Sequence, residues 1–560
     1  MRLPHQFLHA ALSGAALSAG LSAQITAAVN DARSHGTLGD TVLSLDEAIQ
    51  LANGSLAFAA LSSQEAAQLS GVSGVVETIR IDAAVTPTIT LERLLSNVIG
   101  QHHAHVHVAF DGIDGPTGAP VIDAGMLPIG LPLRTNHAHV DNLVIRGGMV
   151  GIEFDSTLHY HPSEFAELHH VHLEHQHMVG LRVLNPQTSG MQAPMMMHEV
   201  HIHETQIGIE VVDDSQFGNV DVSGEHVEIE ECDVGIKVSI NSAGGDHLLA
   251  MHHSHIGSVG NAVVVERVTP TSDSRWRLNF LHGSYHADGT AFDIATSTPG
   301  LTAVNLHHLD VRGGVAAGDF ALRAGTAGGH LALTATECTF WAPASLVAGT
   351  SSSLVRLHND RFEAGAMSLS LTDGSADLLW DTFQSCPITI EAPTTSLPAP
   401  IAFTGCELVR SDLTDSSTGR SVLNGCFLGG SVLSNNVQNL RPELAPWIGR
   451  ATVTPTNPPA GTYVDLQVDL YPGTAAAWML GSVLADPITT AIPLRFYFDL
   501  SSAIALPGLH LLYSRVRLPI PAVNSLRGVS LYAQAVQVPT QGQTSLPPVF
   551  LPMGTIFQID

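Results

Sequence analysis

One motif repeated along residues 142–311 constrains the fold of this chain more than any other feature. Each copy holds a short strand, a turn, and then a glycine followed by alternating apolar residues. The clearest copies are NLVIRGGMVGIEF (142–154), HVHLEHQHMVGLRV (170–183), EVHIHETQIGIEV (199–211) and HVEIEECDVGIKV (226–238). Looser copies begin at His253, His282 and His308, so successive starts lie 26 to 29 residues apart. A near-constant period of this length indicates a solenoid, in which each turn packs on the next.

The pattern within each copy indicates strands rather than helices. Apolar side chains recur at every second position, as at Val171 and Leu173, whereas an amphipathic helix would repeat them every 3.6 residues. Shorter copies continue at 335–340, 359–362, 380–383, 404–408 and 424–428. We therefore predict an all-β chain, with a parallel β-helix over residues 24–445.

Superposing the copies predicts which side chains stack in neighbouring coils. Two aliphatic columns would fill the interior: Leu143, Val171, Val200 and Val227, and Ile145, Leu173, Ile202, Ile229 and Ile256. The aligned glycines Gly151, Gly180, Gly208 and Gly235 predict a turn position with positive φ. Outside, Glu153, Arg182, Glu210 and Lys237, the only lysine of the chain, would form a column of alternating charge.

A short helix is predicted near residues 44–53, ahead of the first clear coils. Ser44 and Glu47 in SLDEAIQLAN have the spacing of a capping box, and such a helix would cover the open edge of the first coil. The segment resembles the SLREAI…AN element that opens many secreted bacterial β-helix proteins, with Asp46 where that family usually has arginine. TIRID (78–82) and TITLERL (88–94) resemble its first strands. The resemblance covers about residues 40–435 and implies a right-handed β-helix of the pectate-lyase-like superfamily.

The pattern changes after Trp447. A Pro-rich segment at 454–461 precedes about six alternating apolar runs with Pro and Gly turns, which predicts a small antiparallel β-sandwich at 454–560. Within it, LPIPAVNSLRGVSLYAQAVQV (518–538) resembles a C-terminal module of exported planctomycete-type proteins. Surface retention, sorting and capping of the last coil are all open as roles.

The N-terminus and the net charge bear on location and partners. Arg2 followed by an apolar, small-residue run predicts a signal peptide at 1–23, the alternative being a buried N-terminal helix. We therefore expect a secreted or cell-surface protein. No later apolar span reaches 18 residues, so no membrane insertion is expected. The net charge of −28 disfavours nucleic acid as a partner, and we expect a monomer.

Five cysteines are too few and too scattered for a disulfide scaffold. The stacking places Cys338, Cys406 and Cys426 at inward positions. Two interpretations are open, namely buried thiols or a disulfide between Cys406 and Cys426.

Carbohydrate-active enzymes share the predicted architecture, and they set requirements for a site. A lyase needs a carboxylate cluster for Ca²⁺ and a base, and a glycoside hydrolase needs two or three facing acidic residues. The nearest candidates are Asp155, Asp213, Asp214 and Asp221, which follow the second strand of successive coils. Their alternative role is that of solvated turn residues.

Histidine is unusually abundant, with 31 residues, and His-x-His pairs crowd residues 102–255. Residues i and i+2 of a strand share a face, so these pairs predict an outward grid of imidazoles and carboxylates, about 4.8 Å apart between coils. The grid is a solvated face, a site for Zn²⁺ or another divalent ion, or a pH-responsive surface. The metal-ligand candidates are His170, His172, His201, His203, Glu228 and His255.

These observations favour an exported, non-catalytic surface or extracellular protein that binds glycans or other surface partners along the solenoid. A divergent polysaccharide lyase or glycoside hydrolase is the alternative, and metal binding by the histidines is a weaker one. No organic cofactor is expected.

Overall fold

The structure is a computed structural model. It describes residues 25–439 except 72–74, 100–107, 160–164, 186–191, 215–218, 243, 268–274, 297–300, 327–329, 349–352, 372–374, 392–400, 417–420 and 425. Beyond them it describes 451–454, 462–468, 474–489, 495–498, 504–505, 515–520, 530–539 and 555–558. The predicted signal peptide at 1–23 lies outside the described residues. The chain divides into two compact units, Met1–Val355 with Ala364–Gly374, and Arg356–Glu363 with Ser375–Asp560.

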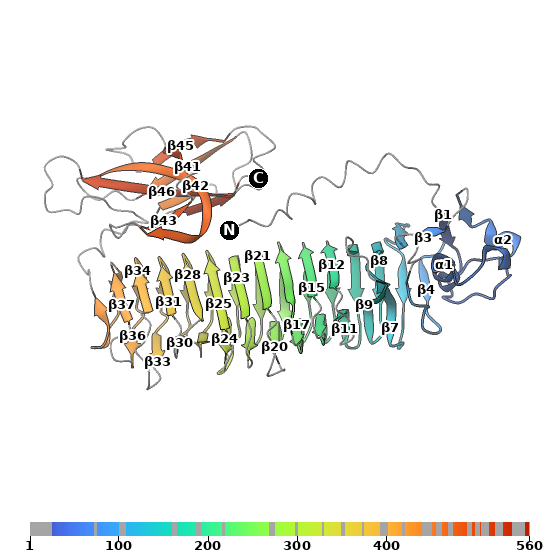
Figure 1. The fold of residues 1–560 in the computed structure, drawn as a ribbon, viewed down its shortest axis with the longest axis horizontal. Helices are drawn as coiled ribbons and strands as arrows, with labels where there is room; N and C mark the ends of the chain where they lie inside the picture. Colours follow the sequence, from blue (N-terminus) through green and yellow to red (C-terminus); the bar gives the residue numbers. More distant parts are fainter. Residues whose placement is uncertain are drawn as a thin grey trace. The chain divides into compact units, whose positions relative to one another are not determined.

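The first unit is a stack of parallel coils (Figure 1). Some coils hold three strands, and others hold two because one longer strand, such as β10 (Ala166–Glu174), pairs with both β12 and β13 of the next coil. In one coil, β12 (Gln192–His198) leads through a corner into β13 (His201–His203), and a second corner leads into β14 (Ile207–Asp213). β12 and β13 pair in parallel with β15 and β16 of the next coil, while β14 pairs with β17 in a separate sheet. This coil-to-coil pairing confirms the predicted right-handed parallel β-helix.

The strands of the first unit belong to two sheets. One sheet contains β1 (Ile25–Val29), β2 (Leu69–Ser70), β3 (Val76–Asp82), β4 (Thr88–Thr90), β5 (Val108–Ile113), β6 (Val121–Asp123), β8 (Ala138–Arg146), β10 (Ala166–Glu174), β12, β13, β15 (Asn219–Glu225), β16 (Glu228–Glu230), β18 (Asp246–His252), β19 (His255–Val259), β21 (Arg275–Ala287), β23 (Leu301–Arg312), β25 (His330–Thr336) and β26 (Thr339–Trp341). The other contains β7 (Ile129–Thr135), β9 (Val150–His159), β11 (Val179–Asn185), β14, β17 (Val234–Ile240), β20 (Asn261–Arg267), β22 (Phe292–Thr296), β24 (Leu322–Thr326), β27 (Ala344–Ala348) and β30 (Met367–Leu371).

The two predicted aliphatic columns lie in the interior. Val171 pairs in register with Leu143, and Leu173 pairs with Ile202 of the next coil. All nine members of the columns are at most 1% exposed. Burial of each such side chain stabilises the fold by about 1.5–3 kcal/mol, so the repeated columns supply much of the driving force for coiling.

The glycine column is present, but the predicted positive φ is wrong. Gly151, Gly180, Gly208 and Gly235 are absent from the positive-φ positions of the described residues. Glycine is required there because the coils approach closely: a Cβ at Gly180 would lie 2.5 Å from Ile202 Cγ2 and 2.8 Å from the carbonyl oxygen of Gly208. The column therefore marks tight packing between coils rather than a left-handed turn.

The predicted N-terminal helix is α1 (Leu45–Ala52). Ser44 is its N-cap, and both hydrogen bonds of the capping box with Glu47 are formed. The buried residues of α1, including Leu45 and Ile49, pack against β1 and β3. A one-turn 3₁₀-helix, η3 (Phe58–Ala60), and α2 (Ser63–Ala66), which has its own capping box, follow before β2.

The outer column of alternating charge also forms. Arg182 Nε lies 2.8 Å from Glu210 Oε2, and its Nη1 lies 3.6 Å from Glu153 Oε2. Lys237 is in register with Glu210, but its Nζ lies 3.8 Å from Glu266 Oε2 instead. This column belongs to the sheet of β9, β11, β14 and β17.

The second unit begins with further parallel strands, which confirm the shorter copies of the repeat. They are β28 (Leu354–His358, whose first two residues precede the unit), β29 (Arg361–Glu363), β31 (Ser375–Leu379), β32 (Thr382–Gln384), β33 (Ile388–Glu391), β34 (Ile401–Thr404), β35 (Glu407–Val409), β36 (Leu413–Asp415), β37 (Ser421–Asn424), β38 (Phe427–Gly429) and β39 (Gln438–Asn439). Phe362, Phe383 and Leu408 succeed one another in register.

All five cysteines are buried free thiols, which agrees with the first of the two interpretations. Cys406 Sγ donates to the carbonyl oxygen of Leu378 at 3.4 Å, and Cys426 Sγ donates to that of Phe403 at 3.4 Å. Burial raises the pKa of the Cys406 thiol, which keeps it protonated at neutral pH.

The C-terminal strands are antiparallel, as predicted. β40 (Ala451–Thr454), β41 (Tyr463–Val468) and β45 (Arg515–Pro519) form one sheet, and β42 (Thr474–Thr489), β43 (Arg495–Phe498), β44 (Ile504–Ala505), β46 (Ser530–Pro539) and β47 (Thr555–Gln558) form another. Among the residues described, no helix combines the length and apolarity needed to cross a bilayer.

Candidate functional site

In each of these coils one residue with positive φ makes a corner, either between two strands such as β12 and β13 or within a longer strand such as β10. The φ angle is 51° at His170, 53° at Glu199 and 55° at His226. Such angles are uncommon for residues other than glycine, and asparagine, aspartate and histidine tolerate them best. The corner column of the first unit consists of Asn142, His170, Glu199, His226, His253, His282, His308 and Glu337.

Two further outward columns flank the corner column. The residue before the corner gives Asp141, His169, His198, Glu225, His252, Leu281 and His307. The second residue after it gives Val144, His172, His201, Glu228, His255, Ser284 and Asp310. We call these three columns the histidine face. The predicted grid therefore exists, but it bends around a corner instead of lying on one flat strand surface.

Imidazole rings stack along these columns. In the corner column the ring centroids of His226 and His253 are 5.3 Å apart, those of His253 and His282 5.1 Å, and those of His282 and His308 5.0 Å. The rings of His172 and His201 are nearly parallel at 4.7 Å. Partial burial lowers the pKa of His172, because the charged ring loses water contacts. His201 lowers it further, because two positive charges side by side repel each other.

The predicted metal ligands are mostly engaged in pairs with carboxylates. His170 lies between Asp141, 3.0 Å from Nδ1, and Glu199, 3.1 Å from Nε2, and the hydrogen bond with Asp141 raises its pKa. The other pairs are His201 Nδ1 with Glu228 Oε2 at 2.7 Å, His203 Nε2 with Glu174 Oε2 at 3.4 Å, and His255 Nε2 with Glu230 Oε1 at 3.5 Å. His172 instead stacks on His201.

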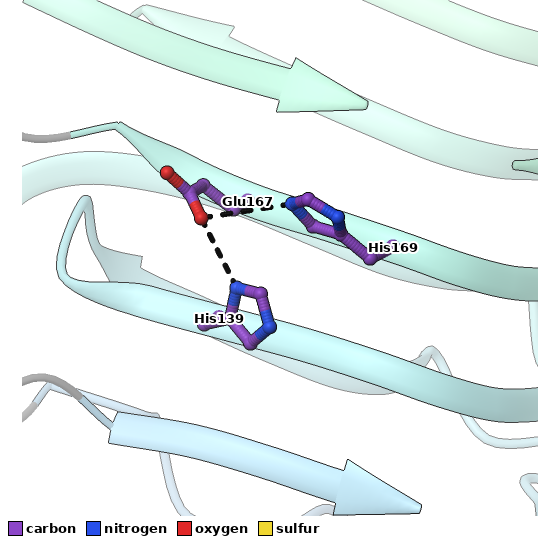
Figure 2. A group of neighbouring side chains, drawn as sticks. All are labelled: His139, Glu167 and His169. Carbon is purple, nitrogen blue, oxygen red and sulfur yellow. Dashed lines mark hydrogen bonds and ion pairs between the residues drawn. The ribbon is translucent and has the colours of Figure 1, made fainter. Parts of the chain in front are cut away.

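A tighter cluster lies on the strands before the corner, and sequence reasoning missed it. Glu167 Oε2 is 3.2 Å from His139 Nδ1 on β8 and 3.6 Å from His169 Nε2 on its own strand, β10 (Figure 2). The two rings are 4.9 Å apart. Hydrogen bonds with His139, which has the larger effect, and with His169 lower the pKa of Glu167 to about 2.

The ligand atoms of these three side chains all lie within 4.8 Å of one another. No other three His, Cys, Asp or Glu side chains among the described residues meet this condition. The sequence signal of the cluster is a Glu-x-His pair at 167–169 and a histidine one coil earlier. The repeat copies begin at residues 142 and 170, so an alignment of the copies does not include these three positions, which precede them.

The four acidic candidates lie at different places in the coil. Asp155 lies within β9, and Asp213 ends β14 of the same sheet, two coils further on. Asp221 lies on β15 in the other sheet. Asp214 Oδ1 accepts a hydrogen bond from Asn241 at 2.7 Å. Burial raises the pKa of Asp221. None of the four belongs to a group of three or more clustered ligand atoms in the part of the chain that the structure describes.

Asp213 is fully buried and takes part in a polar network of the interior. Its Oδ1 accepts a hydrogen bond from Asn185 Nδ2 at 2.9 Å, and its Oδ2 lies 3.2 Å from His247 Nε2. The backbone N–H of Val220 donates to His247 Nδ1. The His247 ring stacks on buried Trp276 at 4.6 Å. With no exposed surface, Asp213 and His247 hold the coil together rather than face a solvent-borne polymer.

Comparisons with known proteins add little to this geometry. No family model and no curated protein matches the chain. A solved structure, the enzymatically active domain of tailspike protein 4 of bacteriophage CBA120, is similar over 75% of this chain with 12% identity and a TM-score of 0.23. The match covers 64% of that domain, which is less than two thirds of its length.

Proposed function

We propose that this protein works outside the cell as a non-catalytic binding protein, whose histidine face holds an extended, neutral glycan. The observation that carries the proposal is the outward columns of hydrogen-bonding side chains, which run over the consecutive coils from β8 to β23. Export is supported by the signal-like N-terminus and by the resemblance to secreted β-helix proteins.

The spacing of the columns favours a polymer over a small molecule. Neighbouring coils lie about 4.8 Å apart, so each column repeats its donors and acceptors at a fixed interval. A chain of sugars carries hydroxyl groups along its length and meets several of these groups at once. Many individually weak contacts then add up, because binding of the first sugar holds the others nearby.

The charge of the protein favours a neutral glycan. The net charge is −28, and carboxylates such as Glu199 and Glu228 lie among the imidazoles of the face. An acidic polysaccharide would be repelled at neutral pH.

An exposed aromatic side chain lies beside the last coils of the face. Trp341 is 38% exposed, and its Nε1 donates to Asp310 Oδ1 at 2.8 Å. An indole ring held in this way offers an apolar surface next to polar groups, a combination that suits a sugar ring.

A lyase or hydrolase would need converging acidic side chains, and the described residues do not bring the acidic candidates together. Asp213 is enclosed, and Asp155 and Asp221 belong to different sheets. The binding proposal therefore has the stronger support.

A polysaccharide panel tests both functions. We expect the protein to co-sediment with at least one neutral polysaccharide, and the double variant H172A/H201A and the variant W341A to bind at least tenfold more weakly. E210Q, on the sheet of β14, is the control and should bind as the wild type does. Failure to bind every neutral polysaccharide would refute the proposal. New chain ends in acidic polysaccharides incubated with Ca²⁺ would instead support the lyase.

A further inference from the structure

We propose that His139, Glu167 and His169 form a binding site for a single transition-metal ion of the zinc type, on the outer surface of β8 and β10 (Figure 2). These residues differ from the candidates suggested by the repeat. The site does not depend on glycan binding, so it stands or falls separately from the proposed function.

The distances match the requirements of a tetrahedral ion. Ligand atoms about 2.0–2.2 Å from zinc lie roughly 3.4 Å from one another. Glu167 Oε2 is 3.2 Å from His139 Nδ1 and 3.6 Å from His169 Nε2, and all three ligand atoms lie within 4.8 Å. A small rotation of the side chains therefore suffices to direct all three at one ion.

The ligand set selects the class of ion. Two imidazoles and one carboxylate suit Zn²⁺, Ni²⁺ or Cu²⁺, whereas Ca²⁺ and Mg²⁺ prefer oxygen ligands alone. Three protein ligands leave a fourth position open for water or for a group of another molecule.

The backbone fixes the site in place. Glu167 is in parallel register with His139, and His169 lies two residues further along the same strand, so all three point outward. Each side chain keeps between 32% and 43% of its surface exposed, which leaves access from solvent. The residue in register with His139 in the preceding coil is Ala109, whose small side chain contributes no ligand atom.

Other pairs on the histidine face lack this arrangement. His172 and His201 stack at 4.7 Å, and His201 pairs with the single carboxylate of Glu228. Elsewhere in the described part of the face, no third residue places a ligand atom within 4.8 Å of both ligand atoms of such a pair. The stacked pair therefore provides a matched control, since its removal also deletes two histidines from the same face.

The experiment uses the full chain, purified without a polyhistidine tag and dialysed against buffered Zn²⁺ at pH 7.5. We expect one tightly held zinc per chain in the wild type and in H172N/H201N. H139N/H169N should hold this ion at least 100-fold more weakly, and E167Q at least tenfold more weakly. Unchanged thermal unfolding of the metal-free variants shows that they fold, which their exposed positions favour.

Two further readouts separate this site from general adsorption to histidines. Co²⁺ in place of zinc should give the strong visible absorption of a four-coordinate ion in the wild type and not in H139N/H169N. Affinity should fall at pH 5, because ligand imidazoles must be neutral. A wild type that holds no zinc, or an H139N/H169N variant that holds as much as the wild type, would overturn the inference.

Discussion

At the scale of single residues, close contact between coils leaves no room for a side chain at the glycine column. A Cβ at Gly208 would lie 2.6 Å from Ile229 Cγ2 and 2.7 Å from the carbonyl oxygen of Gly235. Because the carbonyl belongs to the backbone, the coils themselves must move apart to admit it. We expect G208A to destabilise the fold by about 1–3 kcal/mol, measured by thermal unfolding.

The matched control for this prediction is G325A in β24. A Cβ at Gly325 meets only Val347 Cβ, at an ordinary 3.7 Å, and φ there is not positive. Alanine reduces the entropy of the unfolded chain, so G325A should be neutral or stabilising by a few tenths of a kcal/mol. Equal effects of the two substitutions would mean that close approach is not the reason for the glycine column.

A second prediction at this scale concerns the buried pair of Asp213 and His247. Removal of the Asp213 carboxyl group deletes both its hydrogen bond with Asn185 and its pairing with His247 at a fully buried position, which costs about 3–5 kcal/mol. We expect D213A to lower the thermal midpoint strongly. D214A, which removes only the partly buried hydrogen bond with Asn241, should cost about 1 kcal/mol. A D213A protein as stable as D214A would contradict the structural role of Asp213.

Sequence alone could predict some residue contacts and not others, for a physical reason. The repeat fixes the register between coils, so the column that contains Val171 and Leu143 follows directly from alignment. Positive φ at His170 does not, because histidine tolerates that region but adopts it at only a minority of positions. The pairing of Glu167 with His139 was missed because it lies before the corner, outside the recognisable part of the motif.

At the scale of elements, α1 protects the start of the first unit. Its capping box holds two backbone N–H groups, since Ser44 Oγ accepts from Glu47 and the Ser44 N–H donates to Glu47 Oε2 at 2.9 Å. We expect S44A to destabilise the protein by about 1 kcal/mol. S55A, at an exposed position just after the helix, is the control and should have little effect. The two variants can be compared by limited proteolysis and by thermal unfolding.

The same helix illustrates how far local sequence can predict an element. The spacing of Ser44 and Glu47 is a strictly local signal, and the helix lies where that signal placed it. The glycine column was also located correctly, but its cause was not. The sequence does not show whether a glycine is needed for a left-handed turn or for close packing between backbones. Only the position of the neighbouring coil distinguishes the two.

At the scale of the whole molecule, acidification brings two opposing effects. Protonation of all 31 histidines would change the net charge from −28 to +3, since −28 + 31 = +3. The loss of self-repulsion favours the compact state. Against it, partial burial lowers the pKa of His172, His252 and His282, and burial with His282 lowers that of His307 to about 4. The unfolded chain, with histidine pKa values near 6.5, then binds protons more readily than the folded chain, so folding loses stability as pH falls through 6.5 toward 4.

Salt separates these two effects. At 0.5 M NaCl the charge–charge repulsion across the surface is largely screened, which leaves the contribution of the partly buried histidines. Under these conditions we expect the thermal midpoint to be lower at pH 5 than at pH 7.5. H307N should lose less on acidification than the wild type, by about 1 kcal/mol after allowance for the partial exposure of the ring. The pKa of Glu167 is lowered to about 2, so its ionised carboxylate stabilises the folded state at both pH 5 and pH 7.5. This stabilisation is lost only as the pH falls below about 4.5. A thermal midpoint that rises on acidification in high salt would contradict this expectation. It would show that the stacked imidazoles are protonated in the folded state and are stabilised there by neighbouring carboxylates.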